Sequence, residues 1–122
     1  MSNAYEMPFK CITGTKASAT DFSAGRYKFV DVGTDGNLKL PAADGSVLGV
    51  LQQPGEGGST MDLPVMVSGV SFVVFGSGDD VAAGADLSVD ATGAVVTATT
   101  GKVVAKCLVG GKAGEIGCAI LK

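Results

Sequence analysis

The chain has 122 residues, 46% of them hydrophobic, with 19 glycines, no tryptophan and a formal net charge of −3. This length suits a single domain with a modest core, and the hydrophobic content excludes a mainly disordered chain. Histidine is absent, which removes the Ser-His and Cys-His catalytic dyads and the usual ligands of zinc. Cys11, Cys107 and Cys118 form no CxxC pair, so we expect them to be buried thiols.

The charge is distributed unevenly along the chain. Residues 1–28 carry four basic and two acidic residues, whereas residues 41–100 carry acidic residues and no basic one. An acidic surface repels phosphate, so we expect no binding of nucleic acid. No run of 18 apolar residues is present, and no basic segment followed by an apolar one begins the chain. We therefore expect no membrane association and synthesis in the cytoplasm.

We interpret residues 1–23 as an N-terminal arm and loop, and residues 24–122 as a β domain. Residues 8–13 favour a short strand, and residues 14–25 are small and polar without periodicity. Two interpretations of the strand stay open. It is either the edge strand of the chain's own sheet or an extended arm that adds a strand to the sheet of a neighbour.

The rest of the chain predicts short strands joined by glycine turns. Asp35-Gly36 is typical of a hairpin turn, and no segment has the caps and the 3.6-residue period of a helix. The fold class is therefore all-β, a small β-barrel or sandwich. The predicted strands cover residues 26–32, 38–40, 47–51, 61–75, 81–90, 95–99, 102–109 and 115–121.

The stretch from Met61 to Phe75 is the one that the other strands are expected to cover. Its apolar residues occupy odd positions up to Val67, and after Ser68-Gly69 the apolar set moves to the even positions Val70, Phe72 and Val74. Because side chains of a strand alternate between faces, an inserted step at Ser68-Gly69 would keep one face apolar throughout. Either a two-residue hairpin turn or a glycine bulge within one long strand would provide that step.

The two halves of the domain resemble each other. Phe29-Val30-Asp31, the Asp35-Gly36 turn, residues 47–51 and Gly57-Gly58 are matched by Ser88-Val89-Asp90, the Thr92-Gly93 turn, residues 103–108 and Gly114-Glu115. The offset is 59 residues for the first segment and 56 or 57 for the others. This pattern predicts two similar β units that together close one barrel or sandwich, which would leave few free strand edges.

No motif indicates catalysis or a bound cofactor. Gly110-Gly111-Lys112 is followed by Ala113 where a phosphate-binding loop needs Ser or Thr. Asp79, Asp80, Asp86 and Asp90 lack the glycine and the closing glutamate of a calcium loop, and are expected to be solvated turn residues. The sequence therefore predicts a protein that is not an enzyme and has no metal or cofactor site.

Residues 24–121 resemble the small β-barrel decoration proteins, or head cement proteins, of tailed phages. The matching features, in order, are the glycine-valine strand at Gly49-Val50, the ribbon at Val65–Val70, the turn segment Ala83–Gly93 and the final strand Gly114–Ile116. The resemblance implies a virion protein on the exterior of the capsid that binds major capsid proteins and bridges them, and that assembles as a homo-oligomer, with a trimer favoured.

The N-terminal arm provides the candidate contacts with the capsid or with other copies. An added strand supplies main-chain hydrogen bonds, and apolar side chains serve as anchors; the candidates are Tyr5, Met7, Pro8, Phe9 and Ile12. Two other functions stay open: another virion module, such as a head fibre or spike domain, and a non-viral β module that binds a ligand. The absence of tryptophan counts against the second, because such modules commonly bind through clustered aromatic side chains.

Overall fold

The computed structural model describes residues 10–15, 22, 24–54, 62–76, 80–99 and 101–122, and contains ten strands and no helix among them. The all-β prediction is confirmed. The strands are β1 (Lys10–Thr15), β2 (Phe29–Val32), β3 (Leu38–Lys39), β4 (Gly49–Leu51), β5 (Asp62–Ser68), β6 (Val70–Val74), β7 (Asp86–Val89), β8 (Val95–Thr97), β9 (Ala105–Val109) and β10 (Ile116–Leu121).

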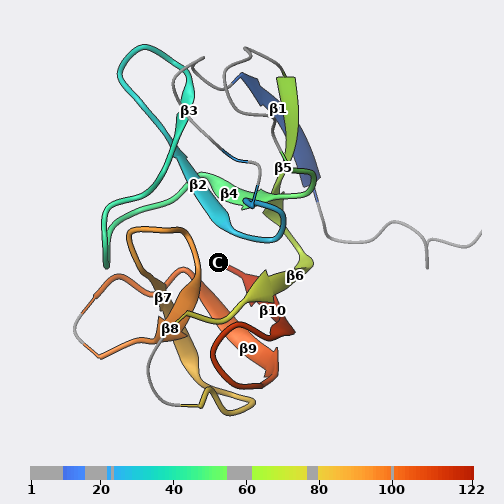
Figure 1. Ribbon diagram of the computed structural model, residues 1–122, viewed down its shortest axis with the longest axis vertical. Coiled ribbons are helices and arrows are strands. Elements are labelled where there is room, and N and C mark those ends of the chain that lie inside the picture. The colour runs from blue at the N-terminus through green and yellow to red at the C-terminus, as the bar shows by residue number, and fades with distance from the viewer. Residues whose placement is uncertain (1–9, 16–21, 23, 55–61, 77–79, 100) are drawn as a thin grey trace, which may run out of the picture.

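The strands form two antiparallel five-stranded sheets, one from each half of the chain (Figure 1). The first sheet has the order β1-β5-β4-β2-β3 and the second has the order β6-β10-β9-β7-β8. Neither sheet closes on itself, so of the two predicted alternatives, a barrel or a sandwich, the closed barrel is excluded. The edge strands are β1 and β3 in the first sheet and β6 and β8 in the second, where Phe75, directly after β6, forms an isolated parallel bridge with Val95 of β8.

The predicted internal repeat is present in the topology, because each strand of the second sheet occupies the place of the strand five earlier in the first. Backbone hydrogen bonds repeat at the predicted spacing of 56 or 57 residues. Three bonds show this. The bond from Lys28 N to Gly25 O corresponds to that from Ala85 N to Ala82 O, the bond from Tyr27 N to Leu51 O to that from Gly84 N to Cys107 O, and the bond from Gly36 N to Gly33 O to that from Gly93 N to Asp90 O.

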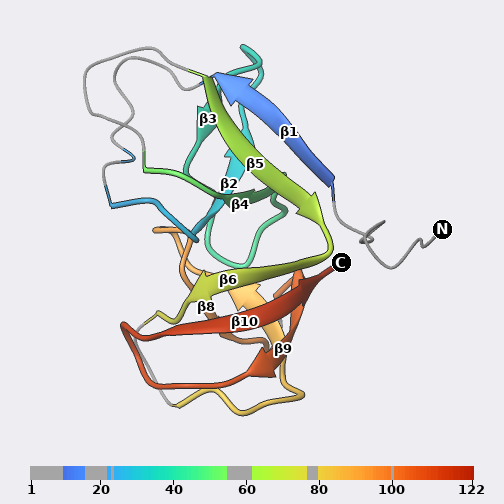
Figure 2. The ribbon, with the colours of Figure 1, turned by 90° about the vertical axis from the view of Figure 1, so that its right-hand side faces the viewer.

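Strands β5 and β6 form one long strand that bends at Gly69 and passes from the first sheet to the second (Figure 2). They do not pair with each other: β5 pairs with β1 and β4, and β6 pairs with β10. The hairpin alternative is therefore excluded. Gly69 has a φ of 103°, which a residue with a side chain adopts only with strain, and this explains the glycine at the bend.

The bend does not shift the buried positions from odd to even numbers. Leu63 and Val65 of β5 are fully buried, and in β6 the buried residues are Ser71 and Val73. Gly69, which lies between β5 and β6, is also buried and also has an odd number. The expectation that Val70 and Phe72 face the core is therefore wrong, and both side chains point outwards.

Two clusters of buried side chains fill the interior. The smaller cluster contains Phe22 and residues of the first sheet, including Val30 and Leu38. The larger one consists mainly of residues of the second half, but Phe29 and Val50 of the first half belong to it. The two repeats therefore share a core, which holds them together as one domain.

Candidate protein-binding site

The outward side of β6, β10 and β9 is apolar, and we refer to it as the outer face. Phe72 lies opposite Cys118, Val70 opposite Ile120, and Cys118 opposite Val109, so these side chains are neighbours across three strands. The only charged residue on the three strands is Lys106. The large apolar side chains left exposed are Val70 (44%), Phe72 (55%), Leu108 (46%), Val109 (57%), Ile116 (57%) and Ile120 (42%).

Such a face is unusual for the surface of a soluble protein. Single exposed apolar residues are common, whereas a contiguous apolar patch marks a site that binds another protein or a ligand. Elsewhere on the described surface the exposed large apolar side chains are scattered, as with Ile12, Val32 and Leu40. The outer face is therefore the surface of this protein that is best suited to adhesion.

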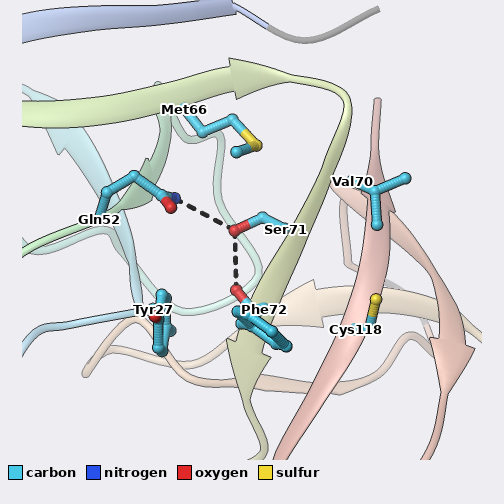
Figure 3. A pocket seen from close by; sticks show the side chains of 7 residues that line it. All are labelled: Tyr27, Gln52, Met66, Val70, Ser71, Phe72 and Cys118. Carbon is cyan, nitrogen blue, oxygen red and sulfur yellow. Dashed lines mark hydrogen bonds between the residues drawn. The ribbon is translucent and has the colours of Figure 1, made fainter. Parts of the chain in front are cut away.

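A pocket of about 240 Å³ lies at one margin of the outer face, beside the bend between β5 and β6 (Figure 3). Val70, Phe72 and Cys118 belong both to the pocket and to the outer face. The remaining lining residues come from the first half of the chain and from the inner side of β6, and are Tyr27, Gln52, Met66 and Ser71.

The polar groups of the pocket are already joined to one another. The Gln52 side-chain amide donates to Val50 O at 3.0 Å and to Ser71 Oγ at 3.1 Å. Ser71 Oγ in turn donates to Phe72 O at 2.9 Å. Ser71 is only 3% exposed, and these bonds give its buried hydroxyl both a donor and an acceptor as partners. The network fixes the side chains of Gln52 and Ser71 and leaves the apolar side chains to contact a bound group.

Aromatic side chains form one wall of the pocket. The rings of Tyr27 and Phe72 lie 5.2 Å apart between centroids with an interplanar angle of 58°. The Arg26 guanidinium carbon lies 4.7 Å from the centre of the Tyr27 ring, which places a positive charge beside this wall. The pocket is thus mainly apolar, and Arg26, which does not line it, contacts one of the aromatic rings that do.

Tyr27 has an uncommon backbone conformation, with a φ of 64°. Positive φ values are costly for residues with large side chains and are often retained where they position a functional group. The conformation is held by hydrogen bonds on both sides, from Tyr27 N to Leu51 O at 2.7 Å and from Val74 N to Tyr27 O at 3.2 Å. These bonds fix the Tyr27 ring against β6.

The described residues contain no group of three His, Cys, Asp or Glu side chains placed to hold a metal ion. Cys107 and Cys118 are free thiols, and Cys118 is only half-buried, contrary to the expectation of buried cysteines. Burial raises the pKa of the Cys107 thiol, and the neighbouring Cys118 raises this pKa further, which disfavours the reactive thiolate. No helix in the described part of the chain is long and apolar enough to cross a membrane.

The residues that the sequence analysis proposed as contacts fall mostly outside the described residues: this applies to Tyr5, Met7, Pro8 and Phe9. Ile12 lies in β1, opposite Val65, and its side chain is 43% exposed. Residues 10–15 form the edge strand of the chain's own first sheet, so this part of the predicted arm belongs to the domain.

The outer face was not predicted from the sequence, because the expected apolar face of residues 61–75 placed Val70 and Phe72 in the core. Both sets of alternate positions in β6 are largely apolar, so the sequence pattern alone does not identify the buried set. Ser71 was a misleading signal, since a serine at a buried position in a strand is read as a solvent-facing residue.

No protein-family profile and no curated protein sequence matches this chain. Among solved structures, the chain is similar to the N-terminal base of the head fibre protein gp8.5 of bacteriophage phi29, with a TM-score of 0.75. The similarity covers 93% of this chain and 95% of the phage chain at 14% sequence identity. At this identity the comparison establishes a shared fold over nearly the whole of both chains.

Proposed function

We propose that this chain is a structural protein of a phage virion that binds the outer surface of the assembled head. The observation that carries the proposal is the fold shared with the base of the phi29 head fibre, which extends over almost the full length of both chains. The protein would be made in the host cytoplasm and would act by adhesion rather than by catalysis.

The outer face supplies the surface that this function needs. A protein that coats a large assembly repeats one contact many times, so the area buried by each contact can be small. What each contact needs is a surface that is complementary in shape to the shell. Exposed side chains such as Phe72 and Ile116 on rigid strands offer apolar area at little cost in conformational entropy. Since the three strands carry only Lys106 as a charge, few charged groups lose water when the face is covered.

The finer part of the proposal is that the protein bridges neighbouring major capsid proteins as a head cement protein, with a trimer as the favoured assembly. Two sheets with a shared core make a rigid body, which can transmit load between the subunits that it contacts. The N-terminal candidates Tyr5, Met7, Pro8 and Phe9 stay candidates for contacts with the capsid or with another copy.

A second candidate function is the base of a head fibre, which joins a projecting fibre to the head. The similarity to the gp8.5 base favours it specifically, because the match covers that base domain almost completely. Both candidates require attachment to the head, and they differ in whether the bound protein only covers capsid subunits or also carries a projection.

Co-sedimentation with purified heads tests the proposal. We expect the full chain to sediment with expanded, DNA-filled heads in a saturable manner and to remain in the supernatant without them. Heads that carry the protein should also resist heat or chelator better than bare heads if it bridges capsid subunits. Absence of saturable binding would contradict the proposal, and binding without added head stability would favour the fibre base.

A further inference from the structure

Strand β6 has a free edge next to the pocket. In the second sheet β6 pairs only with β10, through bonds that include Leu121 N to Gly69 O and Phe75 N to Glu115 O. Backbone groups of alternate residues in a strand point to opposite sides. Those of Val70 and Phe72 therefore point to the free edge. The Phe72 carbonyl there already accepts a hydrogen bond from Ser71 Oγ, so the Val70 groups and the Phe72 N–H are the ones that can pair with another strand beside the pocket.

The size of the pocket suits one large side chain. Its volume of about 240 Å³ exceeds the ~150 Å³ of an engineered apolar cavity that binds benzene. It is smaller than the ~300–1,000 Å³ of most small-molecule sites. Because its polar groups are engaged with one another, the matching group is apolar or aromatic, as in the interface pockets that accept an anchor residue.

The positive charge of Arg26 favours an acidic residue next to the anchor side chain. The Arg26 guanidinium lies over the ring of Tyr27, a residue that lines the pocket, so a carboxylate that reaches this guanidinium from beside the inserted side chain would gain a favourable interaction. An aromatic residue directly beside an acidic one occurs twice in this chain, at Tyr5-Glu6 and at Asp21-Phe22. Phe22 is 1% exposed and belongs to the core of the first half, which leaves Tyr5-Glu6.

The position of β1 indicates that the segment comes from another copy. β1 pairs with one edge of β5, opposite Ser68, and β4 pairs with the other edge. The free edge of β6 lies on the β4 side, because Val74 N donates to Tyr27 O and Tyr27 N donates to Leu51 O of β4. Lys10, the first described residue of β1, therefore lies on the side of β6 that β10 already occupies.

We propose that the free edge of β6 and its pocket bind residues 2–9 of a second copy of this chain, with Tyr5 as the anchor and Glu6 beside Arg26. This is strand addition combined with one buried side chain. Tyr5 is five residues from the start of β1, which spans about 17 Å when extended and suffices to cross to a neighbour. The arm and its site are different surfaces, so two copies can exchange arms reciprocally in a two-fold dimer, or several can join head to tail in a ring. It forms without a capsid.

The test is the molar mass of the full chain in solution across a range of protein concentrations, measured by light scattering and sedimentation equilibrium. We expect a discrete oligomer. Deletion of residues 2–9, which leaves β1 intact, should give a monomer, and Tyr5→Ala should weaken association at least tenfold. Ser2→Ala, on the same segment, is the matched control and should have no effect.

A charge exchange separates the proposed contact from a general loss of folding. Glu6→Arg and Arg26→Glu should each weaken self-association, and an equimolar mixture of the two variants should associate again, because the charges match between different copies. A synthetic peptide of residues 2–9 should bind the deletion variant, and a peptide with Tyr5→Ser should not.

The proposal is overturned if the full chain is monomeric at every concentration, or if the deletion variant keeps the oligomer. Peptide binding to the deletion variant combined with a monomeric full chain would place the segment on its own domain, and would also overturn it. None of these results depends on binding to heads, so the inference and the proposed function can fail separately.

Discussion

Tyr27 and Gly84 occupy equivalent positions in the two halves, and both have a positive φ, 64° and 88° respectively. Each donates its N–H across to the equivalent strand, to Leu51 O and to Cys107 O. The second half uses glycine at this position, which has no side chain to strain the backbone. The first half bears a tyrosine, whose ring forms the wall of the pocket. The difference between the two repeats thus coincides with the candidate binding site.

Gly84→Ala measures the cost of this conformation without other effects. Nothing lies within 4 Å of a Cβ added at Gly84, so the substitution introduces strain in the backbone and no collision. We expect the free energy of unfolding, measured by urea denaturation, to fall by about 1–2 kcal/mol. Ala83→Gly at the neighbouring exposed position is the control. An unchanged stability of Gly84→Ala would mean that the turn relaxes to a negative φ.

Ser88→Ala should stabilise the protein. Ser88 is 1% exposed, and its hydroxyl has no hydrogen-bond partner in the described structure. A buried unpaired hydroxyl costs about 1–3 kcal/mol, so its removal should raise the free energy of unfolding by about 1 kcal/mol. Ser71→Ala is the matched comparison, because the Ser71 hydroxyl is buried and hydrogen-bonded, and its loss should destabilise. Equal effects of the two substitutions would contradict this interpretation.

Asp35→Ala should lower the stability of the fold by an amount that depends on pH. The hydrogen bond from Asn37 N to Asp35 Oδ1 lowers the pKa of Asp35 from its usual value of 3.8. A carboxylate with a lowered pKa in the folded state contributes stability above the unfolded pKa, and this contribution is lost as the pH falls through the folded pKa. We therefore expect the variant to be less stable than the parent at neutral pH, and this difference to shrink in acid.

Urea denaturation at neutral pH and at about pH 2 to 3 provides this measurement, since that range reaches below the usual pKa of an aspartate. Asp31→Ala on the preceding strand is a suitable control for the loss of one negative charge. A difference for Asp35→Ala that grows in acid would contradict the assigned sign.

Substitutions on the outer face should reduce adhesion and leave folding intact. Phe72→Ser and Ile116→Ser replace side chains that are 55% and 57% exposed, so we expect the free energy of unfolding to change by only about 0.5–1 kcal/mol. Co-sedimentation with heads should be lost. Val32→Ser and Leu40→Ser, at similarly exposed apolar positions away from this face, should sediment as the parent does. Equal loss of binding in all four variants would argue against a specific face.

The strand pattern and the repeat could be predicted from the sequence because they depend on local signals. Asp35-Gly36 and Thr92-Gly93 mark equivalent turns, and both glycines have a positive φ, 83° and 88°. The division into two sheets could not be predicted, because it depends on Gly69 bending a continuous strand rather than reversing it. Local sequence does not distinguish these outcomes, since glycine serves both.

The candidate site could not be predicted because it depends on contacts between distant residues. Tyr27, Gln52 and Phe72 meet only when the first sheet is placed beside β6. The sequence predicted a strand over residues 26–32, whereas Tyr27 lies in a turn before β2. The strand predicted at residues 8–13 had two interpretations, an edge strand of the chain's own sheet or an arm that joins the sheet of a neighbour. The pairing of residues 10–15 with β5 selects the edge strand for those residues.

The most direct test of the central claim, adhesion through the second sheet, is a cryo-electron microscopy map of heads with the protein bound. The account predicts that β6, β10 and β9 face the shell, with Phe72 and Ile116 in contact with capsid protein. A map in which these strands face solvent while the first sheet contacts the shell would contradict it.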